Sequence, residues 1–143
     1  MAAKKDKISN GVKKVMVFGT FDILHPGHIN FLRQAKKHGQ LIAVIARDRT
    51  VKRLKGKLPR HNEKKRFGAV NGLKLATRVI LGNLTDKYAA IKKYRPDIIA
   101  LGYDQTNFVK QLPHKLKIFS LNKTKIIRLK SFTPNIYKSS FLK

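Results

Sequence analysis

A turn at residues 19–28, with the sequence GTFDILHPGH, joins a short apolar run to an amphipathic one. The run before it, residues 15–18, has the β-branched and aromatic bias of a buried strand. After it, apolar side chains recur at helical spacing over residues 29–35. Pro26 suits the first helical position, where its missing N–H costs no hydrogen bond. The segment is therefore predicted to fold as a strand, a tight turn and a helix.

The rest of the chain alternates strand-like and helix-like segments in the same way. Strands are expected at residues 13–19, 41–46, 79–81, 97–102, 117–121 and 126–129, and helices at residues 26–39, 62–75, 86–94 and 108–116, the last interrupted by Pro113. This alternation predicts an α/β fold, a Rossmann-like doubly wound parallel sheet in a single domain. Residues 1–12 are expected to form a flexible basic tail, and residues 13–143 the domain.

Two histidines, His25 and His28, stand at the predicted start of the first helix. Free backbone N–H groups and the helix dipole attract phosphate at such a place, and side chains three residues apart lie on one side of a helix. A solvated pair and half of a zinc site are the alternatives. Zinc needs further ligands, and the chain has no cysteine and only seven acidic residues, none at a recognisable metal spacing. We therefore predict a phosphate-binding turn and no metal ligands.

The turn resembles the GxFDxxHxGH signature of the cytidylyltransferase-like nucleotidyltransferases. The fixed positions of that signature are Gly19, Phe21, Asp22, His25, Gly27 and His28. The resemblance implies that the two histidines stabilise the α-phosphate of a nucleoside triphosphate, while the other residues of the motif and Thr20 bind the nucleotide. For Asp22, a purely structural hydrogen bond to the backbone is the alternative.

Further segments narrow the resemblance to one branch of the family, the archaeal FAD synthases, which transfer AMP from ATP to FMN. These segments are residues 46–51 and 55–57, Arg66, and above all residues 96–105, with the sequence PDIIALGYDQ. The resemblance implies that Lys55 and Lys57 bind phosphate and that Arg66, Tyr103 and Asp104 bind the nucleotide. Solvated lysines and a turn or N-cap aspartate are the alternatives. The rival activity is cytidylyl transfer from CTP to glycerol-3-phosphate or a similar phosphorylated alcohol.

The C-terminal tail departs most from the family pattern. Cytidylyltransferases carry an Arg-Thr-x-x-x-Ser-Thr segment there, whereas this chain has Pro134 about where the arginine would fall. Lys138 is expected to supply the missing charge, and Ser139 and Ser140 to contact the nucleotide phosphates. Mg²⁺ is expected to arrive with ATP, because it prefers substrate phosphates and water to a cage of protein ligands. The resemblance also implies a homodimer.

The charge balance is extreme, with 33 Lys and Arg against seven Asp and Glu and a net charge of +26. Three explanations are open: steering of anionic substrates, nonspecific affinity for nucleic acid, and a general lysine bias. A basic nucleic-acid-binding protein on a degenerate nucleotidyltransferase scaffold is therefore the non-enzymatic rival. No apolar run approaches bilayer length, so we expect no membrane association and a cytoplasmic location.

Overall fold

The computed structural model of the protein describes residues 8, 9, 11–103, 105 and 109–130. Its strands are β1 (Lys14–Gly19), β2 (Gln40–Ile45), β3 (Arg78–Leu81), β4 (Ile98–Leu101) and β5 (Lys125–Arg128). Its helices are α2 (Pro26–Lys36), α3 (Asp48–Lys55), α4 (Glu63–Gly72), α5 (Ala89–Tyr94) and α6 (Leu112–Ile118). Strands and helices alternate along the chain, as the sequence predicts.

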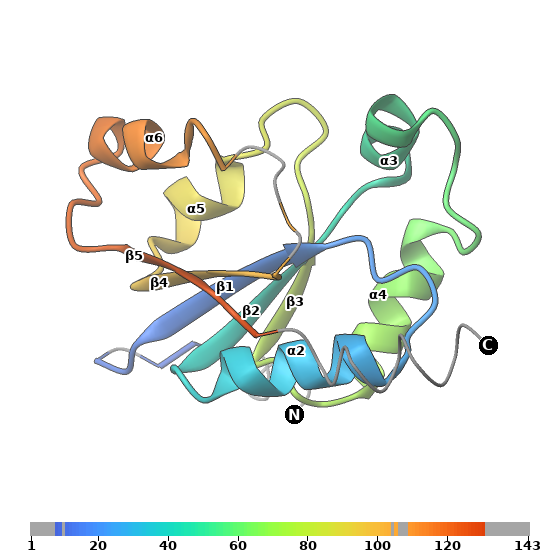
Figure 1. Ribbon diagram of the computed structural model, residues 1–143, viewed down its shortest axis with the longest axis horizontal. Helices are drawn as coiled ribbons and strands as arrows, with labels where there is room; N and C mark the ends of the chain where they lie inside the picture. Colours follow the sequence, from blue (N-terminus) through green and yellow to red (C-terminus); the bar gives the residue numbers. More distant parts are fainter. Residues whose placement is uncertain (1–7, 10, 104, 106–108, 131–143) are drawn as a thin grey trace.

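The five strands form one parallel sheet in the order β3-β2-β1-β4-β5. The chain moves outward from β1 through β2 to β3, and then crosses to the other side of β1 for β4 and β5 (Figure 1). The strand order thus reverses between β1 and β4, which pair through Val15↔Ile98 and Met16↔Ile99. Ligands of such sheets bind outside the carboxyl ends of the strands at this reversal. The predicted doubly wound parallel fold is confirmed.

Helices cover both faces of the sheet, α2 and α4 on one side and α5 and α6 on the other (Figure 1). The pleat of β1 decides which side chains go where, because successive residues of a strand point to opposite faces. Val15 and Val17 belong to the cluster that contains Leu32 of α2. Met16 belongs to the opposite cluster, together with Ile91 of α5. The central strands are therefore buried on both faces, which explains their unbroken apolar sequences.

The first four strands agree with their predicted positions to within a residue or two, but the strand predicted at residues 117–121 is wrong. This region contains the end of α6, whose Leu112 and Leu116 are buried while Ile118 is 57% exposed. The four-residue spacing of the buried leucines is helical. Pro113 does not interrupt this helix but occupies its first turn, where a missing N–H is harmless.

The last residues of the predicted tail contact the sheet. The side chain of Gln40, at the start of β2, accepts a hydrogen bond from the Ser9 backbone N–H at 2.7 Å. The same side chain donates to the carbonyl oxygens of Ser9 and Val12. Residues 1–7 lie outside the described part of the chain, so the extent of a flexible tail stays a prediction.

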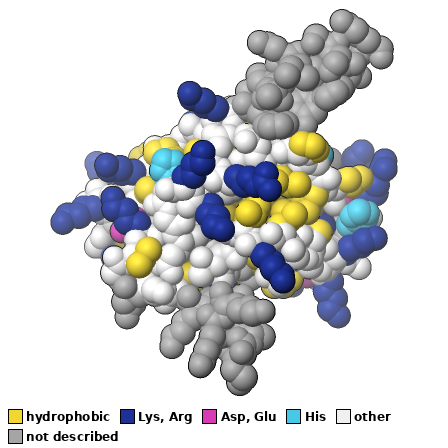
Figure 2. Space-filling view, turned by 90° about the horizontal axis from the view of Figure 1, so that it is seen from below, with side chains coloured by type: hydrophobic (Ala, Val, Ile, Leu, Met, Phe, Trp, Pro, Cys, Tyr) yellow, Lys and Arg dark blue, Asp and Glu magenta, His cyan; other side chains and the backbone are white. Residues whose placement is uncertain are grey.

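Positive charge is spread over the surface of the fold. The face that α2 covers carries Lys and Arg side chains across its whole width, not in one block (Figure 2). Ion pairs join Arg47 to Glu63, Arg66 to Asp48 and Lys92 to Asp86. Within the described residues, no helix combines the length and the apolar character needed to cross a bilayer.

Candidate active site

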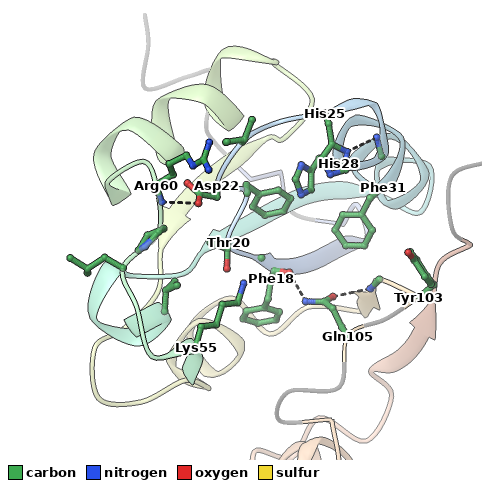
Figure 3. A pocket seen from close by; sticks show the side chains of 18 of the residues that line it. Phe18, Thr20, Asp22, His25, His28, Phe31, Lys55, Arg60, Tyr103 and Gln105 are labelled. Carbon is green, nitrogen blue, oxygen red and sulfur yellow. Dashed lines mark hydrogen bonds between the residues drawn. The ribbon is translucent and has the colours of Figure 1, made fainter. Parts of the chain in front are cut away.

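A cavity of about 910 Å³ opens at the carboxyl ends of β1 and β4. Most of its walls come from the turn after β1 with the first turns of α2, from α3 with the loop that follows it, and from the turn after β4; Lys130, after β5, completes the lining. Figure 3 shows Lys55 and Arg60 on one side of the cavity and Tyr103 and Gln105 on the other. The cavity thus lies where the strand order reverses, between elements that are distant in sequence.

The two histidines lie together on the wall of this cavity. His25 is the N-cap of α2, and its Nδ1 accepts the backbone N–H of Gly27 at 3.0 Å. An accepting Nδ1 carries no proton, so neutral His25 holds its donor proton on Nε2. The rings of His25 and His28 stack with centroids 3.9 Å apart. The start of α2 therefore presents two imidazoles side by side, next to the positive end of the helix dipole.

The glycines of the motif leave room for the rings around them. A Cβ atom at Gly19 would lie 2.6 Å from the Phe21 ring, and one at Gly27 would lie 2.7 Å from the His25 ring. Phe21 is buried, has a positive φ of 51°, and meets the His28 ring edge-on at 5.5 Å. These motif residues hold the histidines in place as well as lining the cavity.

Asp22 ties the turn to the loop between α3 and α4. Its two carboxylate oxygens accept the backbone N–H groups of Arg60 and His61, both at 2.8 Å. Its carbonyl oxygen lies 3.0 Å from Nδ1 of His61. Burial raises the pKa of the Asp22 carboxyl, but these two hydrogen bonds and the nearby charges of His61 and Arg66 outweigh that effect and lower it. The geometry favours the structural role of Asp22, and a contact with the nucleotide stays a prediction.

Arg66 lies beneath the cavity and not on its lining. Its side chain is fully buried. Nη1 donates to the carbonyl oxygen of Thr20 at 2.9 Å, Nε donates to that of His61 at 2.9 Å, and Nη2 binds Oδ1 of Asp48 at 2.7 Å. In this arrangement the guanidinium fixes the backbone around the site, and the predicted contact of Arg66 with the nucleotide is left as a prediction.

Asp48 and Glu63 join the first turns of α3 and α4. Glu63 Oε1 accepts the backbone N–H of Asp48 at 2.9 Å, and Asp48 Oδ2 accepts that of Glu63 at 3.2 Å. Arg47 binds the second oxygen of Glu63 at 3.0 Å. Each acid thus satisfies an N–H group that the other helix leaves unpaired at its N-terminus. The two helices are locked together on the side of the cavity that carries Lys55.

The opposite wall is held by Gln105. Its Oε1 accepts the Gly102 N–H, and its Nε2 donates to the Phe18 carbonyl, both at 2.8 Å. Arg128 Nη1 donates to the carbonyl oxygens of Gly102 and Gln105. These bonds fasten the turn after β4 to the end of β1 and leave Tyr103 61% exposed at the cavity.

The cavity brings most of the predicted site residues together. Those that line it are Gly19, Thr20, Phe21, Asp22, His25, Gly27, His28, Lys55, Lys57 and Tyr103. Asp104, Lys138, Ser139 and Ser140 lie outside the described residues, so their roles stay predictions.

Sequence reasoning did not single out Phe18, Phe31, Leu58, Arg60 or Lys130, which also line the cavity. Gln105 lines it too, and it belongs to the segment at residues 96–105 that carries the resemblance, although no separate role is predicted for it. Arg60 and Lys130 could not have been picked out, because the chain has 33 Lys and Arg and nothing in the sequence distinguishes these two.

A parallel sheet with paired imidazoles at its topological reversal defines a nucleotide-binding α/β protein. The chain belongs to the cytidylyltransferase-like family, whose model matches residues 16–142. This match confirms the predicted family. An FAD synthase from Aciduliprofundum boonei is 47% identical over 120 residues, which cover 83% of this chain and 79% of that protein.

Solved structures share the fold of this chain. A lipopolysaccharide core biosynthesis protein from Thermoplasma volcanium is 40% identical, with a TM-score of 0.78 over 85% of this chain and 99% of that one. A protein of unknown function from Archaeoglobus fulgidus is 17% identical, with a TM-score of 0.68 over 82% of this chain and 89% of that one. The second likeness bears on the fold alone.

Proposed function

We propose that the protein is an FMN adenylyltransferase, which transfers AMP from ATP to the phosphate of FMN and releases FAD and pyrophosphate. The stacked pair of His25 and His28 at the start of α2 is the observation that carries the proposal. The similarity to an FAD synthase over most of the chain supports the choice of substrates.

The reaction needs a binding surface more than it needs covalent chemistry from the protein. A phosphate oxygen of FMN attacks the α-phosphorus of ATP, and the bond from that phosphorus to the oxygen bridging to the β-phosphate breaks. Negative charge spreads over the phosphate oxygens in the transition state. Imidazole donors held in advance at that position lower the barrier, because they need no reorganisation when the charge develops. His25 and His28 are the donors, and Lys55 and Lys57 hold phosphate groups.

The choice of nucleotide base falls to the turn after β4. Gln105 fixes the backbone of Gly102 there, and the side chain of Tyr103 borders the cavity. A site built to pair with the polar edge of one base penalises another base, whose donors and acceptors do not match. We therefore expect ATP to be preferred to CTP.

Mg²⁺ fits this scheme as the partner of the nucleotide. Within the described residues, no three His, Cys, Asp or Glu side chains are grouped as a metal site. Asp22, a carboxylate on the cavity lining, already accepts a hydrogen bond at each oxygen. The residues therefore suit an ion held by substrate phosphates and water, which neutralises phosphate charge. Homodimerisation and a cytoplasmic location remain predictions from the family resemblance and the sequence.

The test offers the purified protein Mg²⁺, one nucleoside triphosphate at a time, and either FMN or glycerol-3-phosphate. Pyrophosphate release is followed, and the product is identified by mass spectrometry. FAD from ATP and FMN is the expected result. A CDP-alcohol formed from CTP and glycerol-3-phosphate would replace the proposal with the cytidylyltransferase rival.

A further inference from the structure

Two exposed aliphatic side chains line the cavity where the turn after β1 meets the loop after α3, an edge that we call the lip; Asp22 joins the two segments through the backbone N–H groups of Arg60 and His61. Ile23, in the turn after β1, is 47% exposed, and Leu58, in the loop after α3, is 58% exposed. Both line the cavity, together with Pro59. When a ligand covers exposed apolar side chains, the apolar area removed from water makes binding more favourable. This lip is therefore suited to an apolar ligand group.

Three cations lie close to Leu58 and Pro59 in the sequence. Lys55, Lys57 and Arg60 are exposed and line the cavity. No ion pair within the described residues involves any of the three. The lip thus offers positive charge with no ion-pair partner beside exposed apolar area, which is the pattern that an amphiphilic phosphate ester requires.

The lip is preorganised and not a loose loop. Asp22 accepts the N–H groups of Arg60 and His61 at 2.8 Å, and Gly56 ends α3 with a left-handed φ of 82°. The helices on either side are joined through Asp48 and Glu63. A surface fixed in this way binds its ligand with little loss of chain entropy.

We propose that this lip, formed by Ile23, Leu58 and Pro59 with Lys55, Lys57 and Arg60, is the subsite for the acceptor, and that it distinguishes an acceptor with a large planar ring from a small phosphorylated alcohol. The inference rests on the proposed function, in which the opposite wall and the histidines bind the nucleotide. The isoalloxazine ring of FMN covers Leu58 and Ile23, and its phosphate lies among the cations, within reach of the α-phosphorus of ATP.

Leu58→Ser tests the subsite, and Leu54→Ser is its matched control. Leu54 is 59% exposed, nearly the same as Leu58, and lies four residues earlier, but it does not line the cavity. We expect Leu58→Ser to raise the KM for FMN roughly five- to tenfold, since it removes the apolar area that the ring covers. The KM for ATP should stay within twofold of the wild-type value. Leu54→Ser should leave both KM values unchanged, and thermal unfolding should show that both variants fold.

A binding measurement accompanies the kinetics. FMN fluorescence is titrated with each protein in the absence of ATP, and the Kd for FMN should rise for Leu58→Ser by the same factor as the KM.

Equal effects of the two substitutions, or an equal rise in the KM for ATP and for FMN, would overturn the subsite. A change in oligomeric state on Leu58→Ser would overturn it as well, because the lip would then be covered by a second copy. If wild-type protein makes no FAD at all, the proposed function itself fails, and that result is separate from these.

Discussion

At the scale of single residues, the site depends on small groups that leave space for large ones. The rings of Phe21 and His25 lie against Gly19 and Gly27, respectively, and occupy the space that a side chain at each glycine would need. The signature is therefore as much a packing pattern as a set of ligands. In the proposed reaction its histidines carry the chemistry, while its glycines and Phe21 pack against their rings.

His28→Ala tests the chemical role directly. Because the imidazole is proposed to donate to the charged phosphate oxygens only in the transition state, its loss should lower kcat by roughly a hundredfold or more. Steady-state pyrophosphate release measures the change. His38→Ala is the control, since His38 is exposed beyond the end of α2 and does not line the cavity. An unchanged kcat for His28→Ala would remove the histidine mechanism and favour the nucleic-acid-binding rival.

Asp22→Asn tests the carboxylate that ties the turn to the α3–α4 loop. The amide has one acceptor oxygen for two backbone donors, and its NH₂ group faces the other donor. We expect a loss of about 1–3 kcal/mol in the free energy of unfolding at pH 7, measured with urea. Asp97→Asn should cost less, because Asp97 accepts the backbone N–H of Lys14 through one oxygen.

The stability difference between wild type and Asp22→Asn should depend on pH. The pKa of Asp22 is lowered in the folded protein, because the hydrogen bonds from His61 and Arg60 and the nearby positive charges outweigh the effect of burial, which raises it. The ionised carboxylate therefore stabilises the fold at pH values above about 4, the ordinary pKa of an aspartate. This stabilisation disappears as the pH falls through the lowered pKa. The stability difference between wild type and Asp22→Asn should accordingly narrow in that range, and a constant difference would contradict the assigned role.

At the scale of elements, α3 and α4 act as one unit around Arg66. The Arg66 side chain, which comes from α4, hydrogen-bonds both the carbonyl oxygen of Thr20, in the histidine turn, and Asp48, at the start of α3. Each of the three nitrogens of the Arg66 guanidinium donates a hydrogen bond, a planar arrangement that a lysine could not reproduce at this buried position.

Arg66→Met should destabilise the protein by about 3 kcal/mol, because it leaves Oδ1 of Asp48 and the carbonyl oxygens of Thr20 and His61 without their hydrogen-bond donor. Lys92→Ala is the control. It breaks an ion pair whose side chains are 49% and 36% exposed, so the loss should stay below about 1 kcal/mol. Urea unfolding measures both. A folded Arg66→Met variant with wild-type stability and a raised KM for ATP alone would instead favour direct contact with the nucleotide.

The sequence predicts those features of the fold that depend on local pattern. The apolar runs of β1, β2 and β4 are unbroken, and Asn62 caps α4 through the Lys65 N–H, as expected of an N-cap. The segment at residues 117–121, with the sequence KIFSL, contains three apolar residues, but its first two residues belong to α6, where Leu112 and Leu116 are buried at helical spacing. A short apolar run is ambiguous by itself, because periodicity over so few residues does not separate a strand from a helix.

Contacts between distant segments are not predictable in this way. Asp22 meets residues 38 and 39 positions away, and Asp48 meets Glu63 from 15 positions away. From the sequence alone, Asp22 is interpreted as a carboxylate near the phosphate site, Asp48 as a loop residue and Glu63 as a residue at the start of a helix. Only the topology of the sheet brings them together and shows that they organise the cavity wall.

At the scale of the whole molecule, the positive charge exceeds what the site uses. The described acids all accept hydrogen bonds, from Arg66, Arg47 and Lys92 or from backbone N–H groups. Little acidic surface is therefore left to neutralise the remaining cations. A net charge of +26 creates a positive potential over the surface, which attracts phosphates from every direction.

The last prediction separates this general field from a built nucleic-acid interface. Because the cations are spread over a whole face and not gathered along a groove (Figure 2), nucleic acid should bind through phosphate charge alone. Counterion release then governs the affinity, so the Kd for a labelled single-stranded 20-mer should rise about a hundredfold or more between 50 and 200 mM KCl. RNA and DNA of the same sequence should behave alike, because nothing in this mode of binding contacts the 2′-hydroxyl.

Fluorescence anisotropy measures both series, and ATP at millimolar concentration, as a small polyanion, should compete only weakly. Tight binding that persists at 200 mM KCl with a preference for RNA would contradict this view, since it requires specific contacts, and it would favour the nucleic-acid-binding rival over the adenylyltransferase.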